Sequence, residues 1–357
     1  MLAPLFHAWE RRLASATKDR VVRPFDWGID WISSNGHHSN TTDAAGAADS
    51  LEHWVEEVMR DSQAFFTAPR TSEFDFTDSP NALRSTGEAG TLRFPSALAT
   101  PHPETNIVVA RWFPSKDASS PGTKARGRAV VVLPQWNSNA GGHIGLSRML
   151  ARVGVSALRL SLPYHDWRMP PELARADYIV SSNIARTVQV CRQAVLDTRR
   201  AIQWLSDQGF ERIGILGTSL GSCLSLLTSA HEPKIRAQAL NHVSPWFADV
   251  VWRGLSTQHV REGLNGHIDL ERLRRLWRPI SPYSYLDRVR DTRTLLVYAK
   301  YDLTFPVDLS RQLVSEFAQR GLPHQVTVLP CGHYTSGSAP FKFVDGYVLT
   351  KFLRSNL

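Results

Sequence analysis

The chain has 357 residues, of which 42% are hydrophobic and 21% charged, proportions that are ordinary for a globular protein. Its formal net charge of +8 is dispersed among acidic residues, so no basic arm or nucleic-acid-binding module is indicated. No stretch approaches the roughly 18 apolar residues of a membrane span, and the N-terminal residues lack the apolar core of a signal peptide, so a cytoplasmic location is expected.

Residues 1–104 are predicted to form an N-terminal extension that is partly helical. Apolar residues recur at helical spacing over 5–13 and again over 51–59. The polar segment between them contains His37 and His38, but adjacent histidines do not share a helix face and no thiol or carboxylate pattern accompanies them. We therefore expect a solvated loop there rather than a metal site.

From about residue 105 onward, short apolar runs alternate with helical stretches. This alternation predicts an α/β fold with a mostly parallel central sheet and helices on both of its faces. The run 129–133 is apolar throughout, as expected of a strand buried on both faces. The predicted strands cover residues 107–113, 129–133, 157–162, 213–216, 238–242, 294–299 and 325–329, and the predicted helices 145–152, 183–205, 220–230 and 307–320.

The three cysteines, Cys191, Cys223 and Cys331, lie far apart and form no Cys-x-x-Cys pair. A zinc site, a redox pair and a disulfide framework are therefore not expected. In the helix predicted over 183–205, buried-type residues follow an alternating four- and three-residue spacing, and Cys191 falls on that stripe. We interpret Cys191 as a core residue and not as a nucleophile.

About fifty residues separate the strands predicted at 238–242 and 294–299. Within them, residues 246–292 contain several tryptophans, leucines and prolines and are too apolar for a disordered loop. Two interpretations stay open: the insertion forms a lid over a pocket, or it forms helices that extend the core.

The most informative motif is Gly217-Thr218-Ser219-Leu220-Gly221, which fills the pattern Gly-x-Ser-x-Gly. It follows an apolar run and precedes a segment that is typical of a helix start. A strand, a sharp turn and a helix form a nucleophile elbow, in which the turn lifts the serine oxygen clear of the sheet. A Cβ at either glycine would collide with the strand or the helix. Ser219 is thus the predicted nucleophile, and a turn of small residues without a catalytic role is the alternative.

A serine hydroxyl needs a base to remove its proton, and histidine suits that task near neutral pH. His333 follows the last predicted strand and opens at the same sheet edge as Ser219, because the carboxyl ends of parallel strands share one edge. Asp302 has the matching position one strand earlier and is the predicted acid, with Asp308 and Asp287 as weaker alternatives. The non-catalytic alternatives are a surface histidine and an aspartate that caps a helix.

The chain order Ser219, Asp302, His333, with each residue after its own strand, resembles that of the α/β-hydrolase-fold serine hydrolases. The resemblance extends from about residue 107 to the C-terminus. It implies an α/β-hydrolase domain over residues 105–357, with the insertion at 246–292.

The resemblance also implies an oxyanion hole. One donor is the backbone N–H of Leu220, at the start of a helix where an anion is favoured. The second comes from the loop after the strand 129–133, where Trp136 is our first choice and Gln135 our second. Many relatives have His-Gly at this point, whereas this chain has Pro134-Gln135.

The loop after the strand 157–162 contains Tyr164 and His165. It ends at the same sheet edge, so both residues are candidates for substrate binding, and a self-contained hydrogen-bonded turn is the alternative. His143 is expected at the start of the helix 145–152, and an approach to the oxyanion loop is the alternative.

These residues predict hydrolysis of a carboxylic ester, with a small acyl molecule as the substrate and no metal or organic cofactor. A peptidase or a thioesterase would use the same side chains. Two further alternatives are a non-catalytic binding module with this fold and a lipid-active enzyme whose positive charge brings it into peripheral contact with an anionic membrane. The sequence does not indicate the oligomeric state.

Overall fold

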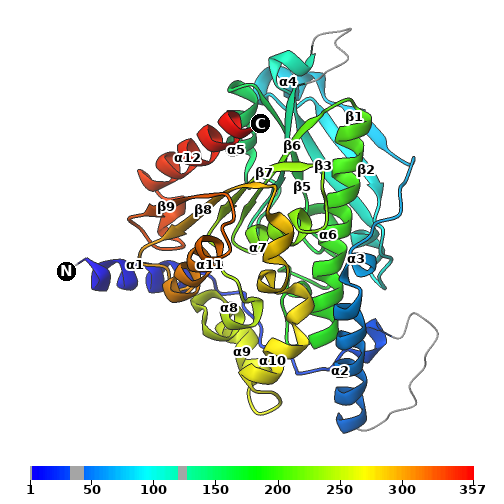
Figure 1. Cartoon of the computed structure of the whole chain (residues 1–357), viewed down its shortest axis with the longest axis vertical. Helices are drawn as coiled ribbons and strands as arrows, with labels where there is room; N and C mark the ends of the chain where they lie inside the picture. Colours follow the sequence, from blue (N-terminus) through cyan, green and yellow to red (C-terminus); the bar gives the residue numbers. More distant parts are fainter. Residues whose placement is uncertain (1, 33–43, 120–126) are drawn as a thin grey trace.

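The computed structural model describes residues 2–32, 44–119 and 127–357, and the predicted loop around His37 and His38 lies outside them. Within the described residues, a nine-stranded sheet has the strand order β1-β2-β3-β5-β4-β6-β7-β8-β9 (Figure 1). The strands are β1 (Asp75–Asp78), β2 (Gly90–Pro95), β3 (Ile107–Phe113), β4 (Arg128–Leu133), β5 (Val155–Leu160), β6 (Arg212–Thr218), β7 (Ile235–Asn241), β8 (Arg293–Ala299) and β9 (His324–Leu329).

Most of the strand pairs are parallel. From β5 through β4, β6, β7 and β8 to β9, each strand pairs in parallel with its neighbour. β3 pairs antiparallel with β5, and β2 and β1 continue the antiparallel part to one edge. The fold is α/β with a mostly parallel sheet, as the alternating pattern predicted.

Helices cover both faces of this sheet, which was also predicted (Figure 1). α5 (Ile144–Arg152) and α12 (Phe341–Asn356) pack on one face, in a core that includes Leu150 and Leu353. α6 (Ile184–Asp207) and α7 (Leu220–Ser229) pack in the larger core on the other face. The remaining α-helices are α1 (Ala3–Ser15), α2 (Ala44–Arg60), α3 (Ser62–Phe65), α4 (Pro80–Thr86), α8 (Phe247–Arg253), α9 (Gln258–Leu264), α10 (Leu270–Leu276) and α11 (Val307–Gln319).

All of the strands predicted between residues 107 and 329 form, but β1 and β2 were not predicted. They arise from residues 1–104, so the N-terminal extension contributes strands as well as helices. β1 is a short edge strand whose residues Asp75–Asp78 are largely exposed, and it therefore lacks the apolar alternation that marks a strand.

The long helix α6 follows its predicted apolar stripe. Cys191 is 0% exposed and lies in the core between the helix and the sheet, as predicted. At the start of the helix, the side chain of Asn183 accepts a hydrogen bond from the N–H of Arg186. This bond satisfies one of the N–H groups that the first turn leaves without a partner.

The insertion at residues 246–292 forms α8, α9 and α10. A short 3-10 turn joins α8 to α9, and two further 3-10 segments follow α10. Trp277 is fully buried, and its Nε1 donates a hydrogen bond to the carbonyl oxygen of Ile184 on α6. α10 packs against α2 of the N-terminal region. The insertion therefore extends the core. None of the helices in the described parts of the chain is long and apolar enough to cross a membrane.

The first helix, α1, is attached to the loop that follows β9. Glu10 is fully buried there, and its carboxylate accepts 2.9 Å hydrogen bonds from the N–H groups of Tyr334 and Thr335. A Cβ at Gly332 would lie 2.4 Å from Glu10 Cδ, so the missing side chain of Gly332 permits this close approach. The N-terminal helix thus contacts the same loop that carries His333.

Candidate active site

Ser219 lies on the sharp turn between β6 and α7. Its backbone has φ 57° and ψ −119°, a conformation that non-glycine residues rarely adopt and that costs roughly 1–3 kcal/mol. A Cβ at Gly217 would lie 2.0 Å from the carbonyl oxygen of Gly221, and a Cβ at Gly221 would lie 2.3 Å from that of Leu133. Both glycines are therefore needed for close packing, as predicted, while the positive φ falls on Ser219 itself.

His333 connects Ser219 to Asp302. Its Nε2 lies 3.1 Å from Ser219 Oγ, and its Nδ1 lies 2.9 Å from Asp302 Oδ2. Because an ionised carboxylate only accepts hydrogen bonds, Nδ1 carries the ring proton and Nε2 is free to accept the proton of Ser219. The three predicted residues thus meet in one hydrogen-bonded chain, from the loops that follow β6, β8 and β9.

Asp302 also closes the turn in which it lies. Its Oδ1 accepts hydrogen bonds from the N–H groups of Thr304, at 2.8 Å, and Phe305, at 2.7 Å. The weaker candidates for the acid lie elsewhere, because Asp308 forms an exposed ion pair with Arg253 and Asp287 forms one with Arg320. Of the three predicted acids, the structure brings Asp302 to His333.

Neighbouring charges overcome the effect of burial on the pKa values of both residues. Burial raises the pKa of Asp302, but the charge of His333 and the hydrogen bonds from His242 and His333 hold that pKa well below its usual range. Burial lowers the pKa of His333, but the charge of Asp302, its hydrogen bond and the charge of Glu10 raise that pKa above its ordinary value. Asp302 therefore stays ionised near neutral pH and stabilises the imidazolium form of His333.

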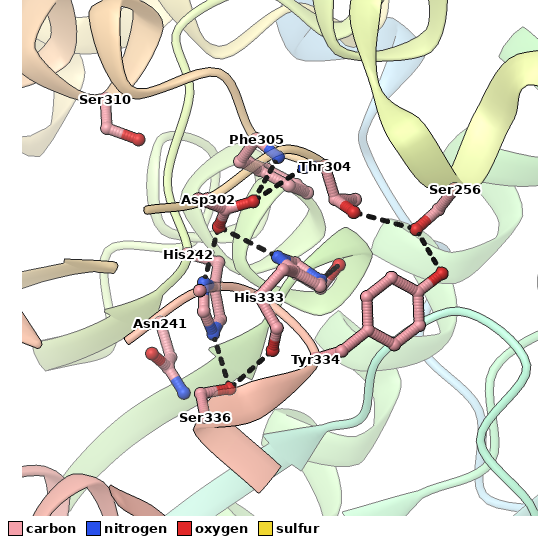
Figure 2. Close-up of polar contacts among 12 residues, drawn as sticks. Asn241, His242, Ser256, Asp302, Thr304, Phe305, Ser310, His333, Tyr334 and Ser336 are labelled. Atoms are coloured by element: carbon pink, nitrogen blue, oxygen red, sulfur yellow. Dashed lines mark hydrogen bonds and ion pairs between the residues drawn. The ribbon is translucent and has the colours of Figure 1, made fainter. Parts of the chain in front are cut away.

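A second histidine, His242, shares the carboxylate of Asp302 (Figure 2). Its Nδ1 lies 2.9 Å from Asp302 Oδ2, the oxygen that also faces His333, and the two imidazole centroids are 4.2 Å apart. Its Nε2 lies 3.1 Å from Ser336 Oγ, and that hydroxyl donates a 2.7 Å hydrogen bond to the backbone oxygen of His333. The hydroxyl of Ser336 thus links His242 to the loop that carries His333.

The sequence prediction missed His242 because it ends an apolar run and is predicted there as the last residue of a strand. In the structure β7 ends at Asn241, and the chain turns at His242 with a φ of 59°. The signal that could have identified it is its position. It follows the strand next to β6, at the sheet edge where Ser219 lies.

His242, Asp302 and His333 are also the one group of described residues whose ligand atoms lie close enough, within 4.8 Å of one another, to hold a metal ion. Both Nδ1 atoms, however, face the same carboxylate oxygen at hydrogen-bond distance. The remaining nitrogens face Ser219 and Ser336. Hydrogen bonds within the protein account for the arrangement of all three side chains.

The three residues predicted for the oxyanion hole, Leu220, Trp136 and Gln135, line the cavity in front of the nucleophile. The N–H of Leu220 is the first of α7 and has no carbonyl partner within the helix. Among the hydrogen bonds of the described residues, none uses the N–H of Trp136 or Gln135, whereas that of Asn137 donates to His165 Nε2 at 2.9 Å. The N–H groups of the predicted residues are therefore free to bind an oxyanion.

Tyr164 and His165, which were predicted to bind substrate, lie away from this cavity, because both side chains are fully buried and neither is part of its wall. His165 instead supports the loop that follows β4. Its Nδ1 donates to the carbonyl oxygen of Pro163 at 2.9 Å, and its Nε2 accepts the N–H of Asn137. Burial lowers the pKa of His165 to about 4, which keeps the ring neutral and Nε2 able to accept. The Tyr164 hydroxyl lies 2.9 Å from His102 Nδ1, away from the cavity.

The cavity in front of Ser219 has a volume of about 770 Å³, which lies in the range of small-molecule sites. His143, which precedes α5 as expected, also lines it, and its Nε2 lies 2.9 Å from Thr218 Oγ1. The N-terminal segment and α12 contribute further parts of the wall. The insertion supplies apolar side chains, Trp246, Phe247, Val250 and Val251.

The parallel sheet, the nucleophile elbow and the loops at its carboxyl edge together define the α/β-hydrolase fold. Acetyl xylan esterase from Paenibacillus sp. R4 is similar with a TM-score of 0.60 and 14% identity, over 97% of this chain and 99% of that one. Acetyl xylan esterase 1 from Thermoanaerobacterium sp. JW/SL YS485 has a TM-score of 0.58 and 15% identity, over 86% and 93% of the two chains.

Acylaminoacyl peptidase from Pyrococcus horikoshii is similar with a TM-score of 0.59 and 14% identity, over 80% of this chain. The match covers 42% of the peptidase, so this chain spans less than half of that protein. At these identities the likeness shows the fold alone. Comparison with protein-family models finds no match for the sequence, and comparison with curated proteins finds none either.

Proposed function

We propose that this protein is a serine hydrolase that cleaves a carboxylic ester of a small acyl substrate. The observation that supports it most is the hydrogen-bonded chain from Ser219 through His333 to Asp302, at the cavity wall. Two proteins of similar fold that are named as esterases match almost their whole length, whereas the peptidase matches over less than half of its own. This difference favours an ester over a peptide. The domain of residues 105–357 would carry the reaction, with 246–292 as one wall of the cavity.

In the first half of the proposed reaction, Ser219 Oγ attacks the carbonyl carbon of the ester while His333 Nε2 takes its proton. The bond between the carbonyl carbon and the alcohol oxygen then breaks, and His333 returns the proton to the departing oxygen. In the second half, His333 removes a proton from water, and the hydroxide attacks the acyl-serine. The carboxylic acid leaves, and Ser219 regains its proton. Asp302 stays ionised throughout and orients the imidazole.

Two backbone groups would stabilise the negative oxygen of each tetrahedral intermediate. The N–H of Leu220 is one, and that of Trp136, or of Gln135 as the second choice, is the other. Each such donor contributes roughly 3–4 kcal/mol to the stability of a transition state of this kind. His242 would act as a positioning residue, because it holds the carboxylate oxygen that orients His333.

A peptidase or a thioesterase remains a second candidate, since the same side chains serve both reactions and one protein of similar fold is an acylaminoacyl peptidase. Rates of hydrolysis on esters, amides and thioesters distinguish these activities. p-Nitrophenyl esters of graded chain length, matched acyl amides and matched acyl thioesters should be hydrolysed at different rates, and we expect the esters to have the highest kcat/KM.

The nucleophile is tested with a fluorophosphonate probe, which reacts with activated serine hydroxyls. We expect labelling of the unmodified protein and none of Ser219→Ala, whose loss of the nucleophile should lower turnover by about 10⁶. Ser229→Ala is a matched control, because Ser229 is a buried serine at the far end of α7. Equal labelling of the protein and of Ser219→Ala would remove Ser219 as the nucleophile. No labelling of the unmodified protein would reject the hydrolase and leave a binding module with the same fold.

A further inference from the structure

The N-terminal segment that follows α1 builds one wall of the cavity. Thr17 and Arg20 line the cavity there, together with Arg175 from the loop between β5 and α6. Burial makes a charge costly unless an opposite charge or hydrogen bonds compensate it. The partners of these two arginines therefore indicate what kind of group this wall can accommodate.

Arg175 is compensated within the protein. Its Nη1 lies 2.9 Å from Asp19 Oδ1, and its Nε lies 3.6 Å from Asp177 Oδ1. Asp177 is shared with Arg23, whose Nη2 lies 3.1 Å from Asp177 Oδ2. Two arginines and two aspartates alternate in this array, so Arg175 adds no net charge to the cavity.

Arg20 is not part of that array. Its Nη2 donates a 3.0 Å hydrogen bond to the neutral hydroxyl of Tyr334, and its buried Nε has no hydrogen-bond partner among the described residues. The Tyr334 hydroxyl lies 2.7 Å from Ser256 Oγ, which lies 2.9 Å from Thr304 Oγ1 (Figure 2). These contacts hold the phenol, and the guanidinium with it. Arg20 is thus a half-buried cation on the cavity wall that no carboxylate of the described chain pairs with.

His259 lies in the field of the same arginines. It is buried, and neither of its ring nitrogens has a hydrogen-bond partner in the part of the chain that the structure describes. Its ring stacks on that of Trp136, with 5.7 Å between the centroids. Burial, and after it the charges of Arg175 and Arg20, lower the pKa of His259 to about 4. The imidazole is therefore neutral near pH 7 and adds no positive charge beside Trp136.

We propose that Arg20 binds an anionic group of the substrate, a carboxylate or a phosphate, while Ser219 reacts with the acyl carbon of the same molecule. The guanidinium can offer such a group its Nη1 donors, which have no hydrogen-bond partner among the described residues and, unlike Nε, are not buried, and keep its Nη2 bond to Tyr334. Arginine suits this role because its rigid N–H donors match the oxygens of carboxylates and phosphates. This inference rests on the proposed esterase function and narrows its substrate to an acyl compound with a negative charge.

The test measures kcat/KM of the full chain on paired neutral and anionic esters. p-Nitrophenyl butyrate is paired with the p-nitrophenyl monoester of glutaric acid, whose charge is on the acyl side. Phenyl acetate is paired with 4-acetoxybenzoate, whose charge is on the leaving group. In Arg20→Gln we expect kcat/KM of at least one anionic ester to fall about 10- to 100-fold relative to its neutral partner. Arg20→Lys keeps the charge and should recover part of the loss.

Arg12→Gln is the matched control, because Arg12 is exposed on α1 and its replacement removes the same charge from the helix just before the segment of Arg20. An unchanged ratio in Arg20→Gln, or an equal fall in Arg12→Gln, overturns the proposal. Glutarate and inorganic phosphate, added as inhibitors of butyrate hydrolysis, distinguish a carboxylate site from a phosphate site. The better inhibitor of the unmodified protein should lose its effect in Arg20→Gln.

Calorimetry on Ser219→Ala separates this inference from the proposed function. If glutarate or phosphate binds and Arg20→Gln abolishes that binding, the anion site stands even in a protein that hydrolyses no ester. If neutral esters are hydrolysed through Ser219 but neither anion binds in an Arg20-dependent way, the anion site is rejected and the esterase stands.

Discussion

Two regions of the molecule meet at the candidate active site, and they are encoded differently in the sequence. The loops after β6, β8 and β9 carry Ser219, Asp302 and His333, and each residue is placed by the strand that precedes it. The N-terminal segment reaches the same place only through contacts with distant residues, as Glu10 does with the loop of His333 and Arg20 with Tyr334. The strand ends thus supply the proposed reacting groups, and the N-terminal segment holds one of their loops and adds charge to the cavity.

If this division is correct, substitutions in the loops after β6, β8 and β9 cause the largest losses of turnover. Asp302→Asn should lower turnover by up to roughly 10⁴, because an amide cannot stabilise the imidazolium and favours the wrong tautomer of His333. Steady-state kinetics on a p-nitrophenyl ester measures the effect. Asp308→Asn is the control, since Asp308 lies in an exposed ion pair and should keep a near-normal rate. A near-normal rate in Asp302→Asn instead would remove that residue from the proposed triad.

His242 should have an intermediate effect, because it touches the triad without reacting. In His242→Gln the carboxylate of Asp302 loses one of its two imidazole partners, and a small misorientation of His333 can cost up to about 100-fold in kcat. KM should change little. Proton NMR provides a second measurement, since the variant should lose one downfield Nδ1 proton signal and shift that of His333.

The control for His242 is His324→Gln, which removes a half-buried histidine from β9 without touching Asp302. An equal loss of kcat in the two variants, or an unshifted His333 signal in His242→Gln, would show that His242 serves packing alone.

Glu10 should have the smallest effect on the maximal rate and a distinct effect on its pH dependence. The reaction needs neutral His333, so activity is lost as the pH falls through the pKa of that residue. The charge of Glu10 helps to raise this pKa, after the larger contributions of burial, which lowers it, and of Asp302, which raises it. In Glu10→Gln the pKa should fall, and the acid limb of kcat/KM should move to lower pH.

Glu56→Gln serves as the control for the pH profile, because Glu56 is exposed on α2, outside the cavity wall. An acid limb of Glu10→Gln that stays in place or moves to higher pH would contradict an electrostatic role of the first helix. It would leave the hydrogen bonds to Tyr334 and Thr335 as the function of Glu10.

The sequence predicts the sheet and the triad because both depend on local patterns. The run before Gly217 is apolar and ends in a motif that only a tight turn can accommodate, so Ser219 could be placed directly. Asp302 and His333 follow from the rule that parallel strands end at one edge. α12, by contrast, was not predicted, because exposed apolar residues such as Phe343 and Tyr347 obscure its periodicity.

The sequence does not reveal the direction of a side chain where that direction depends on distant partners. Tyr164 and His165 were placed at the correct sheet edge, but their loop turns inward, where the buried pair of Arg159 and Asp166 fixes it. Arg20 depends on Tyr334, 314 residues further along the chain. No local spacing reveals such a contact.

The bonds of Glu10 to Tyr334 and Thr335 span 324 and 325 residues of the sequence. Isolated helices of 13 residues, the length of α1, are marginal in water, so during synthesis α1 must wait for the last strand before it gains its partner. The elements around the elbow, β4, β6, α7 and β7, all precede β8 and β9 in the chain and are therefore synthesised before the partner of α1. In a nascent chain the turn that carries Ser219 would therefore form before the loop that carries His333 is held in place, and the proposed triad would be complete only after α1 has bound the loop that follows β9.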